Sequence, residues 1–306
     1  MILRRKNFHS EKLLVPSRRF FAYAAIYLFW GASFLAIREI VQVTPPFLAA
    51  GFRFTAAGLI LLALSVAQRA PWPSARELRS AAMLGMVFFS VNYACVFWAE
   101  QRVASGYAAV VSSTQPVWIF AGEWLWLRAV RPTGAGLIGM ALGMAGVILL
   151  VLPSVRDGSL TAGVAVLFGA LCWCFGTLWS RRLKVPKSRY SNAGLQMFLG
   201  GIVLLAVSAL AGEMRQLPDV LAHWNLRLSL DMAYLVVAAS ILAFLAFIWL
   251  IDREPASRVS SYAYVNPLIA VALGAMVGGE RLAPVQLAGA ACVLSGVVIT
   301  LRSRRA

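Results

Sequence analysis

The feature that most constrains this chain is a series of ten long apolar stretches. Nine of them contain no charged residue, and the tenth, 47–67, is interrupted only by Arg53. Each has the roughly 17–25 residues that an α-helix needs to cross the hydrocarbon core of a bilayer. Because only helices and closed barrels satisfy their own backbone hydrogen bonds in lipid, we expect an all-α membrane protein with ten transmembrane helices. The nine uncharged stretches are 20–37, 81–99, 103–122, 134–153, 160–180, 192–212, 232–251, 259–279 and 284–301.

The positive charges follow the order of these stretches. The 306 residues include 28 Lys and Arg against 12 Asp and Glu, a net charge of +16. If the chain starts in the cytoplasm and crosses the membrane at every stretch, 20 of the 28 basic residues fall inside and six outside, with Arg53 and Arg258 left uncounted. This is the positive-inside distribution of membrane proteins. We therefore expect both termini in the cytoplasm, contact with anionic lipids at that face, and no binding of nucleic acid.

The second half of the chain repeats features of the first. Five crossings per repeat is an odd number, so the second repeat must be inverted relative to the first. Inverted repeats are typical of alternating-access carriers, whose substrate site lies near the midplane between the repeats. We expect a basic arm at 1–19, repeats at 20–153 and 160–301, and a tail at 302–306. The matched pairs include Trp30 with Trp173, Gly58 with Gly201, Gln115 with Asn266, and Pro116 with Pro267.

Two polar interruptions lie inside apolar stretches at related positions. The first is Ser112-Ser113-Thr114-Gln115-Pro116, and the second runs from Ser260 through Tyr262 and Asn266 to Pro267. Proline removes a helical hydrogen bond and commonly bends the helix. Pro116 and Pro267 are therefore predicted to be the bending points of the two repeats.

A carrier cavity needs polar groups at mid-depth between aromatic walls. The residues predicted to bind substrate on this basis are Trp30, Arg53, Asn92, Gln115, Trp173, Ser240, Tyr262 and Asn266. Hydrogen bonding between helices is the alternative role for each polar member of this set. For Arg53, the alternatives are an ion pair with Glu39 or Glu100 and recognition of a substrate carboxylate.

The apolar stretches contain no constellation that would support catalysis or metal binding. Both histidines, His9 and His223, lie outside the stretches, and Cys172 and Cys174 point to different faces of one helix. We therefore predict no catalytic residues, no metal site and no cofactor, and the chain is not expected to be an enzyme.

Several motifs resemble those of EamA-type permeases in the drug/metabolite transporter superfamily, in particular the YedA-like branch. The resemblance implies a ten-helix inner-membrane carrier of a bacterium that exports small amphipathic metabolites such as amino acids or drug-like compounds. Import or exchange, and a structural or sensory role without transport, remain alternatives, and the sequence leaves open whether two copies form a homodimer. The matching segments are Trp30-Gly31-Ala32-Ser33-Phe34, Pro46 with Arg53-Phe54, Ala104-Ser105-Gly106, Gln115-Pro116, 261–267 and Gly278-Gly279-Glu280-Arg281-Leu282.

Overall fold

The structure, a computed structural model, describes residues 8–128, 133–156, 160–279 and 284–302, so part of the basic arm, the tail from 303 and the Glu280-Arg281-Leu282 turn lie outside it. Within the described ranges every regular element is helical, which confirms the all-α prediction. The first half contains α1 (Phe8–Val41), α2 (Pro46–Ala67), α3 (Ala75–Gly85), η1 (Met86–Val91), α4 (Asn92–Glu100), α5 (Ser105–Ser112), α6 (Gln115–Leu125) and α7 (Gly134–Arg156). The second half contains α8 (Leu160–Ser180), α9 (Arg189–Leu210), η2 (Glu213–Gln216), α10 (Leu217–His223), α11 (Leu226–Tyr234), η3 (Leu235–Leu242), α12 (Ala243–Ile251), α13 (Ala256–Val259), α14 (Tyr262–Met276) and α15 (Pro284–Arg302).

Six continuous helices in the described residues are long and apolar enough to cross a membrane, so the chain is a multi-pass membrane protein. They are Arg18–Val41, Pro46–Ala67, Ala75–Glu100, Leu160–Ser180, Arg189–Leu210 and Leu226–Ile251. These correspond to six of the ten expected crossings. The other four expected crossings fall on α7, α15 and two interrupted helices, α5 with α6 and α13 with α14.

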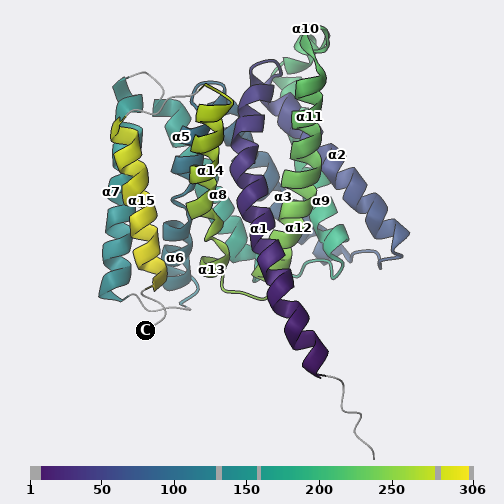
Figure 1. The fold of residues 1–306 in the computed structure, drawn as a ribbon. Coiled ribbons are helices and arrows are strands. Elements are labelled where there is room, and N and C mark those ends of the chain that lie inside the picture. Colours follow the sequence, from purple (N-terminus) through teal and green to yellow (C-terminus); the bar gives the residue numbers. More distant parts are fainter. Residues whose placement is uncertain (1–7, 129–132, 157–159, 280–283, 303–306) are drawn as a thin grey trace, which may run out of the picture.

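The helices form one bundle with a helix pair on each flank (Figure 1). In both the contacts and the picture, α7 packs along α15 on one flank and α2 along α9 on the other. Helix α1 lies between the flanks and contacts α14, α12 and α5. We call the two ends of the bundle the α10 end and the α13 end, after the short helices found there; α1 enters from the α13 end, and α15 finishes at that end.

The α2–α9 pair depends on glycines that allow the two backbones to approach closely. A Cβ atom at Gly58 would lie 2.4 Å from the backbone nitrogen of Phe198, and one at Gly201 would lie 2.5 Å from that of Thr55. Real Cβ atoms do not approach backbone at these distances. The two glycines matched in the sequence repeat therefore serve helix packing, as small residues commonly do inside membranes.

This packing predicts that Gly58→Ala destabilises the protein. The added methyl group would force α2 and α9 apart, and such overpacking costs about 1–3 kcal/mol. Gly134→Ala is the matched control, because a Cβ at Gly134 would meet no atom within 4 Å. Thermal unfolding of the purified variants in detergent should show a lower midpoint for Gly58→Ala alone; equal midpoints would mean that the helices adjust without cost.

Irregular turns occur at corresponding places in the two halves. The π-helical turns η1 and η3 lie within the long helices that end at Glu100 and Ile251. The interruptions at Ser113–Thr114 and Ser260–Ser261 separate α5 from α6 and α13 from α14. π turns inside α-helices are frequent at functional sites. The four irregular turns therefore mark candidate functional segments in both halves of the chain.

Candidate functional site

A buried cavity opens between α1, α4, α5, α8 and α14. From Trp30 and Tyr262, the lining residues of α1 and α14 run toward the α10 end (Figure 1). Helix α4 runs in the same direction from Asn92, because the carbonyl of its last residue, Glu100, accepts a hydrogen bond from Arg38 near the end of α1. The complete lining is Trp30, Ser33, Phe34, Ile37, Asn92, Tyr93, Val96, Ala109, Ser112, Ser113, Gln115, Trp173, Tyr262, Ala263 and Asn266. Six of the eight sequence-predicted site residues are in this set.

Hydrogen bonds link the two halves of the chain at the cavity. The Tyr262 hydroxyl donates to Gln115 Oε1 at 2.8 Å. The orientation of the Asn266 amide that satisfies its surroundings places its nitrogen 3.0 Å from the carbonyl oxygens of Tyr27 and Tyr262. Asn92 Nδ2 donates to the Phe88 carbonyl at 3.3 Å within its own helix. The interhelical role foreseen for these amides is thus present at Gln115 and Asn266, and both side chains also line the cavity.

Aromatic side chains form the wall of the cavity that faces the α13 end. The ring centroid of Trp30 lies 5.4 Å from that of Trp173, 4.8 Å from that of Tyr262 and 5.5 Å from that of Phe247. Trp30 Nε1 donates to the Ala239 carbonyl at 2.9 Å, which fixes the indole. The buried Trp173 Nε1 interacts with the Tyr262 hydroxyl, which ties the second tryptophan to the same wall.

Pro116 and Pro267 lie near the cavity but at different positions in their helices. Pro116 lies in the first turn of α6, just after the interruption, whereas Pro267 lies inside α14. A residue in a helix donates its N–H to the carbonyl four positions earlier, and proline has no N–H. Pro267 therefore leaves the carbonyl of Ala263, a residue that lines the cavity, without that donor. Pro116 removes no such bond, because an N–H in the first turn of a helix has no acceptor within that helix.

Arg53 and Ser240 are the two predicted site residues that the structure places outside the cavity lining. Arg53 is fully buried, and its Nε donates to Ser240 Oγ at 2.9 Å. Its guanidinium carbon lies 4.7 Å from the ring centroid of Phe54 and 5.0 Å from that of Tyr93. Tyr93 lines the cavity, so Arg53 lies behind that wall.

The carboxylates proposed as partners of Arg53 differ in what they contact. Glu39 pairs with Arg227, at 3.1 Å from Oε1 to Nη2. Glu100 is fully buried and attracts the Arg53 charge. A buried arginine commonly stacks on aromatic rings, because its charge is more weakly hydrated than an ammonium. The observed surroundings of Arg53 are those of a structural cation.

The sequence prediction missed several residues of the cavity. Tyr93 follows Asn92 directly after the π turn η1, and Ser33 lies about one helical turn beyond Trp30. Ser112 and Ser113 belong to the predicted polar interruption, in which a role was assigned only to Gln115 and Pro116. Three-residue spacing from Trp30 was a signal for Ser33. The π turn had no equivalent signal, because hydrophobic periodicity does not reveal it.

The chemistry of the lining restricts what the cavity can bind. None of the described lining residues carries a formal charge; they offer amides, hydroxyls and aromatic faces. Such groups suit a small molecule with both polar and planar apolar parts. The enclosed volume is about 60 Å³. Ligand pockets usually measure about 300–1,000 Å³, so the walls must separate to admit a metabolite.

Comparison with known proteins places this architecture among transporters. The model of the EamA-like transporter family matches residues 20–152 and 160–302. The inner membrane transporter YedA of Escherichia coli strain K12, which is named as uncharacterized, is 34% identical over 92% of this chain and 90% of its own. Protein PecM of Dickeya dadantii is 28% identical over 90% of this chain and 91% of its own. A solved crystal structure shares the fold, with a TM-score of 0.64 at 19% identity over 95% of this chain and 99% of that chain.

Proposed function

The chain belongs to the EamA-like transporter family, and we propose that it is an alternating-access carrier that exports small amphipathic metabolites, such as amino acids or drug-like compounds, across a bacterial inner membrane. The observation that carries this proposal is the uncharged cavity that groups from both halves of the chain line, next to the two interrupted helices. Carriers built from inverted repeats bind substrate at such a position, beside interrupted helices.

The proposed architecture is ten crossings in two inverted repeats, 20–153 and 160–301. The family match in two segments supports a duplication, as do the π turns and the interruptions that occur once in each half. Pro116 and Pro267, which follow the two interruptions along the chain, are the proposed bending points of the two repeats. In an inverted pair, one bend would serve each side of the membrane.

Transport by the purified protein is the direct test. We expect proteoliposomes containing the full chain to move at least one compound from a panel of amino acids and amphipathic dyes faster than empty liposomes do. Loading each compound inside or outside distinguishes export from import, and loading both sides reveals exchange. A well-folded protein that moved nothing and bound nothing from the panel would favour the structural or sensory alternative.

We also predict the orientation of the protein in the membrane. Both termini and the loop from Arg181 to Arg189 should be cytoplasmic, and the segment from Glu213 to Leu230 should be periplasmic. Arg181 contacts residues at the α13 end, whereas Glu213 accepts hydrogen bonds from Phe47 N and Leu48 N at the start of α2. Fusions of a cytoplasmically active and a periplasmically active reporter after Arg189 and within 213–230 should give opposite signals. The reversed pattern would contradict the proposed topology.

A further inference from the structure

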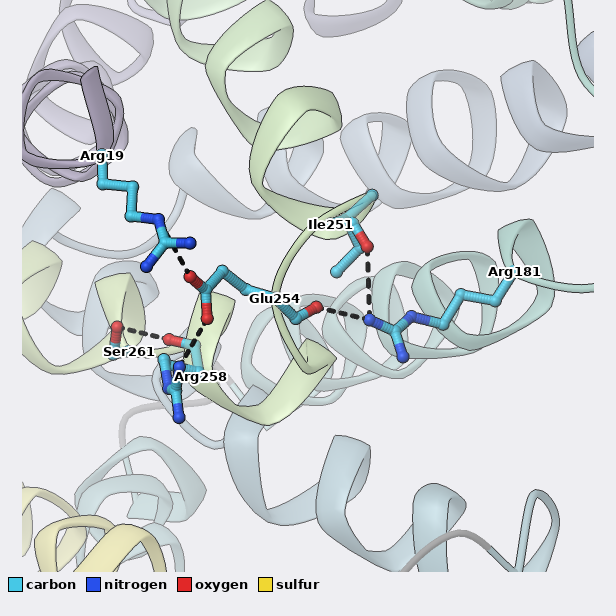
Figure 2. Close-up of polar contacts among 6 residues, drawn as sticks. All are labelled: Arg19, Arg181, Ile251, Glu254, Arg258 and Ser261. Carbon is cyan, nitrogen blue, oxygen red and sulfur yellow. Dashed lines mark hydrogen bonds and ion pairs between the residues drawn. The ribbon is translucent and has the colours of Figure 1, made fainter. Parts of the chain in front are cut away.

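A cluster of charged residues closes the end of the bundle that lies beyond the aromatic wall (Figure 2). It consists of Glu254, Arg19, Arg181 and Arg258, which we call the Glu254 cluster. Glu254 lies in the turn between α12 and α13, and its side chain is only 5% exposed. A nearly buried carboxylate destabilises the folded protein unless it is well paired. The contacts of Glu254 therefore indicate which segments it holds together.

The Glu254 carboxylate joins α1 to α13. Its Oε1 lies 3.5 Å from Arg19 Nε, and its Oε2 accepts from Arg258 Nη1 at 2.5 Å. Figure 2 shows the carboxylate between the two guanidinium groups. Arg19 is near the start of the α1 span and Arg258 belongs to α13, so one carboxylate connects the first and second halves of the chain.

Arg181 adds a third helix to the cluster. This residue directly follows α8, and its Nη2 donates to the carbonyl oxygens of Ile251 at 3.2 Å and Glu254 at 2.5 Å. The Ile251 carbonyl ends α12, where the helix dipole favours a cation, and the Glu254 carbonyl belongs to the turn that follows. The cluster therefore fastens the ends of α1, α8 and α12 to one another at the α13 end.

The cluster is connected to the cavity by a short chain of hydrogen bonds. The Ser261 hydroxyl donates to the Arg258 carbonyl at 2.6 Å and is also hydrogen-bonded to the Tyr27 hydroxyl at 2.8 Å. The next residue is Tyr262, whose hydroxyl holds Gln115 in the cavity. Because Ser261 and Tyr262 are adjacent in the chain, a displacement of the cluster would also displace Tyr262 and its hydrogen bond to Gln115.

We infer that the Glu254 cluster is the latch that keeps the carrier closed at the α13 end, which is the cytoplasmic end in the proposed topology. The inference rests on the proposed alternating-access function. From the midplane, the cavity lining extends toward the α10 end, while the aromatic wall and the cluster lie on the other side. Opening the cytoplasmic side requires α1 and α8 to separate from α12 and α13, which breaks the Arg19–Glu254 and Arg181–Glu254 contacts. The latch thereby sets the equilibrium between the state that is closed at the cytoplasmic side and the state that is open there.

The natural residue Cys174 provides a probe of this opening. It is buried about two helical turns before Arg181 on α8, and its Sγ lies 3.4 Å from the Gln115 carbonyl. In a full-length chain with Cys95, Cys172 and Cys292 changed to Ser, a membrane-impermeant maleimide added from the cytoplasmic side should label Cys174 slowly. Glu254→Gln should raise that rate about fivefold or more, because it weakens the contacts that favour the closed state.

Matched variants make the test decisive. Arg19→Gln should also raise the labelling rate; because Arg19 is half-exposed, this variant carries the test if Glu254→Gln does not give a monodisperse protein. Glu39→Gln removes the ion pair with Arg227 on the opposite side of the cavity and should not raise labelling from the cytoplasmic side. Unchanged labelling in folded Glu254→Gln and Arg19→Gln, or an equal rise in Glu39→Gln, would overturn the latch.

Transport measured in the membrane vesicles that are used for labelling distinguishes a failure of the latch from a failure of the proposed carrier function. If the parent chain transports but the latch variants leave labelling unchanged, the latch is wrong and the carrier function stands. If labelling rises as expected but the parent chain transports nothing from the panel, the closing contact is supported and the proposed function is contradicted.

Discussion

Gln115→Leu is expected to lower transport by at least about tenfold while the protein remains folded. Leucine has a similar size but cannot accept the hydrogen bond that Gln115 Oε1 receives from Tyr262 at 2.8 Å. The buried Tyr262 hydroxyl would then lack its partner, and such a loss costs about 1–3 kcal/mol. The same change removes the amide that the cavity offers to substrate, so substrate binding and the placement of Tyr262 should suffer together.

Gln196→Leu is the matched control for this prediction. Gln196 is a buried glutamine of α9 that donates to Asn192 Oδ1 at 2.7 Å and is not among the residues lining the cavity. Its replacement should leave transport in proteoliposomes within about a factor of two, since no cavity hydrogen bond is lost. Comparable losses in both variants, at equal monodispersity, would show that the effect is a general one of losing buried amides.

The span positions were predictable from sequence because lipid imposes one strong requirement on the chain. The six continuous helices overlap six of the expected apolar stretches within a few residues, as at 160–180 and Leu160–Ser180. The two interruptions were also predicted from the sequence, with the bends expected at Pro116 and Pro267. Both helices break at the hydroxyl residues just before: Pro116 is compatible with a first helical turn, and α14 continues through Pro267.

The cavity was predictable where the chain itself supplied a pattern. Gln115, Tyr262 and Asn266 stand beside prolines at repeat-related places, and the structure brings them to one cavity. The Glu254 cluster had no such pattern, because its members come from three segments far apart in sequence: Arg19, Arg181, and Glu254 with Arg258. The position of Arg53 and Ser240 outside the cavity lining could not be read from the sequence for a related reason. Ser240 lies in the π turn η3 and accepts a hydrogen bond from Arg53, and a turn of this kind depends on tertiary packing.

Arg53→Gln is expected to destabilise the protein strongly. The change removes the buried guanidinium that donates to Ser240 and stacks on Phe54 and Tyr93. Loss of a hydrogen bond from a charged group costs about 1.5–3 kcal/mol, and the lost stacking adds to that cost. Arg227→Gln is the control, because that arginine pairs with Glu39 at a half-exposed site, where an ion pair contributes about 1 kcal/mol or less. Thermal unfolding in detergent should show a large loss for Arg53→Gln and a small one for Arg227→Gln.

The double variant Arg53→Gln, Glu100→Gln separates a structural role for Arg53 from recognition of substrate. With both side chains neutral, the charge imbalance that the single change creates is removed, so part of the lost stability should return. Because Tyr93 stands between Arg53 and the cavity, we expect transport of neutral and carboxylated compounds to return together. If stability returned while carboxylated compounds alone were lost, the guanidinium would have to reach the cavity during transport and bind the carboxylate through its planar fork. A double variant as unstable as Arg53→Gln would instead mean that the stacking on Phe54 and Tyr93 and the bond to Ser240, rather than the opposing charge, hold this region together.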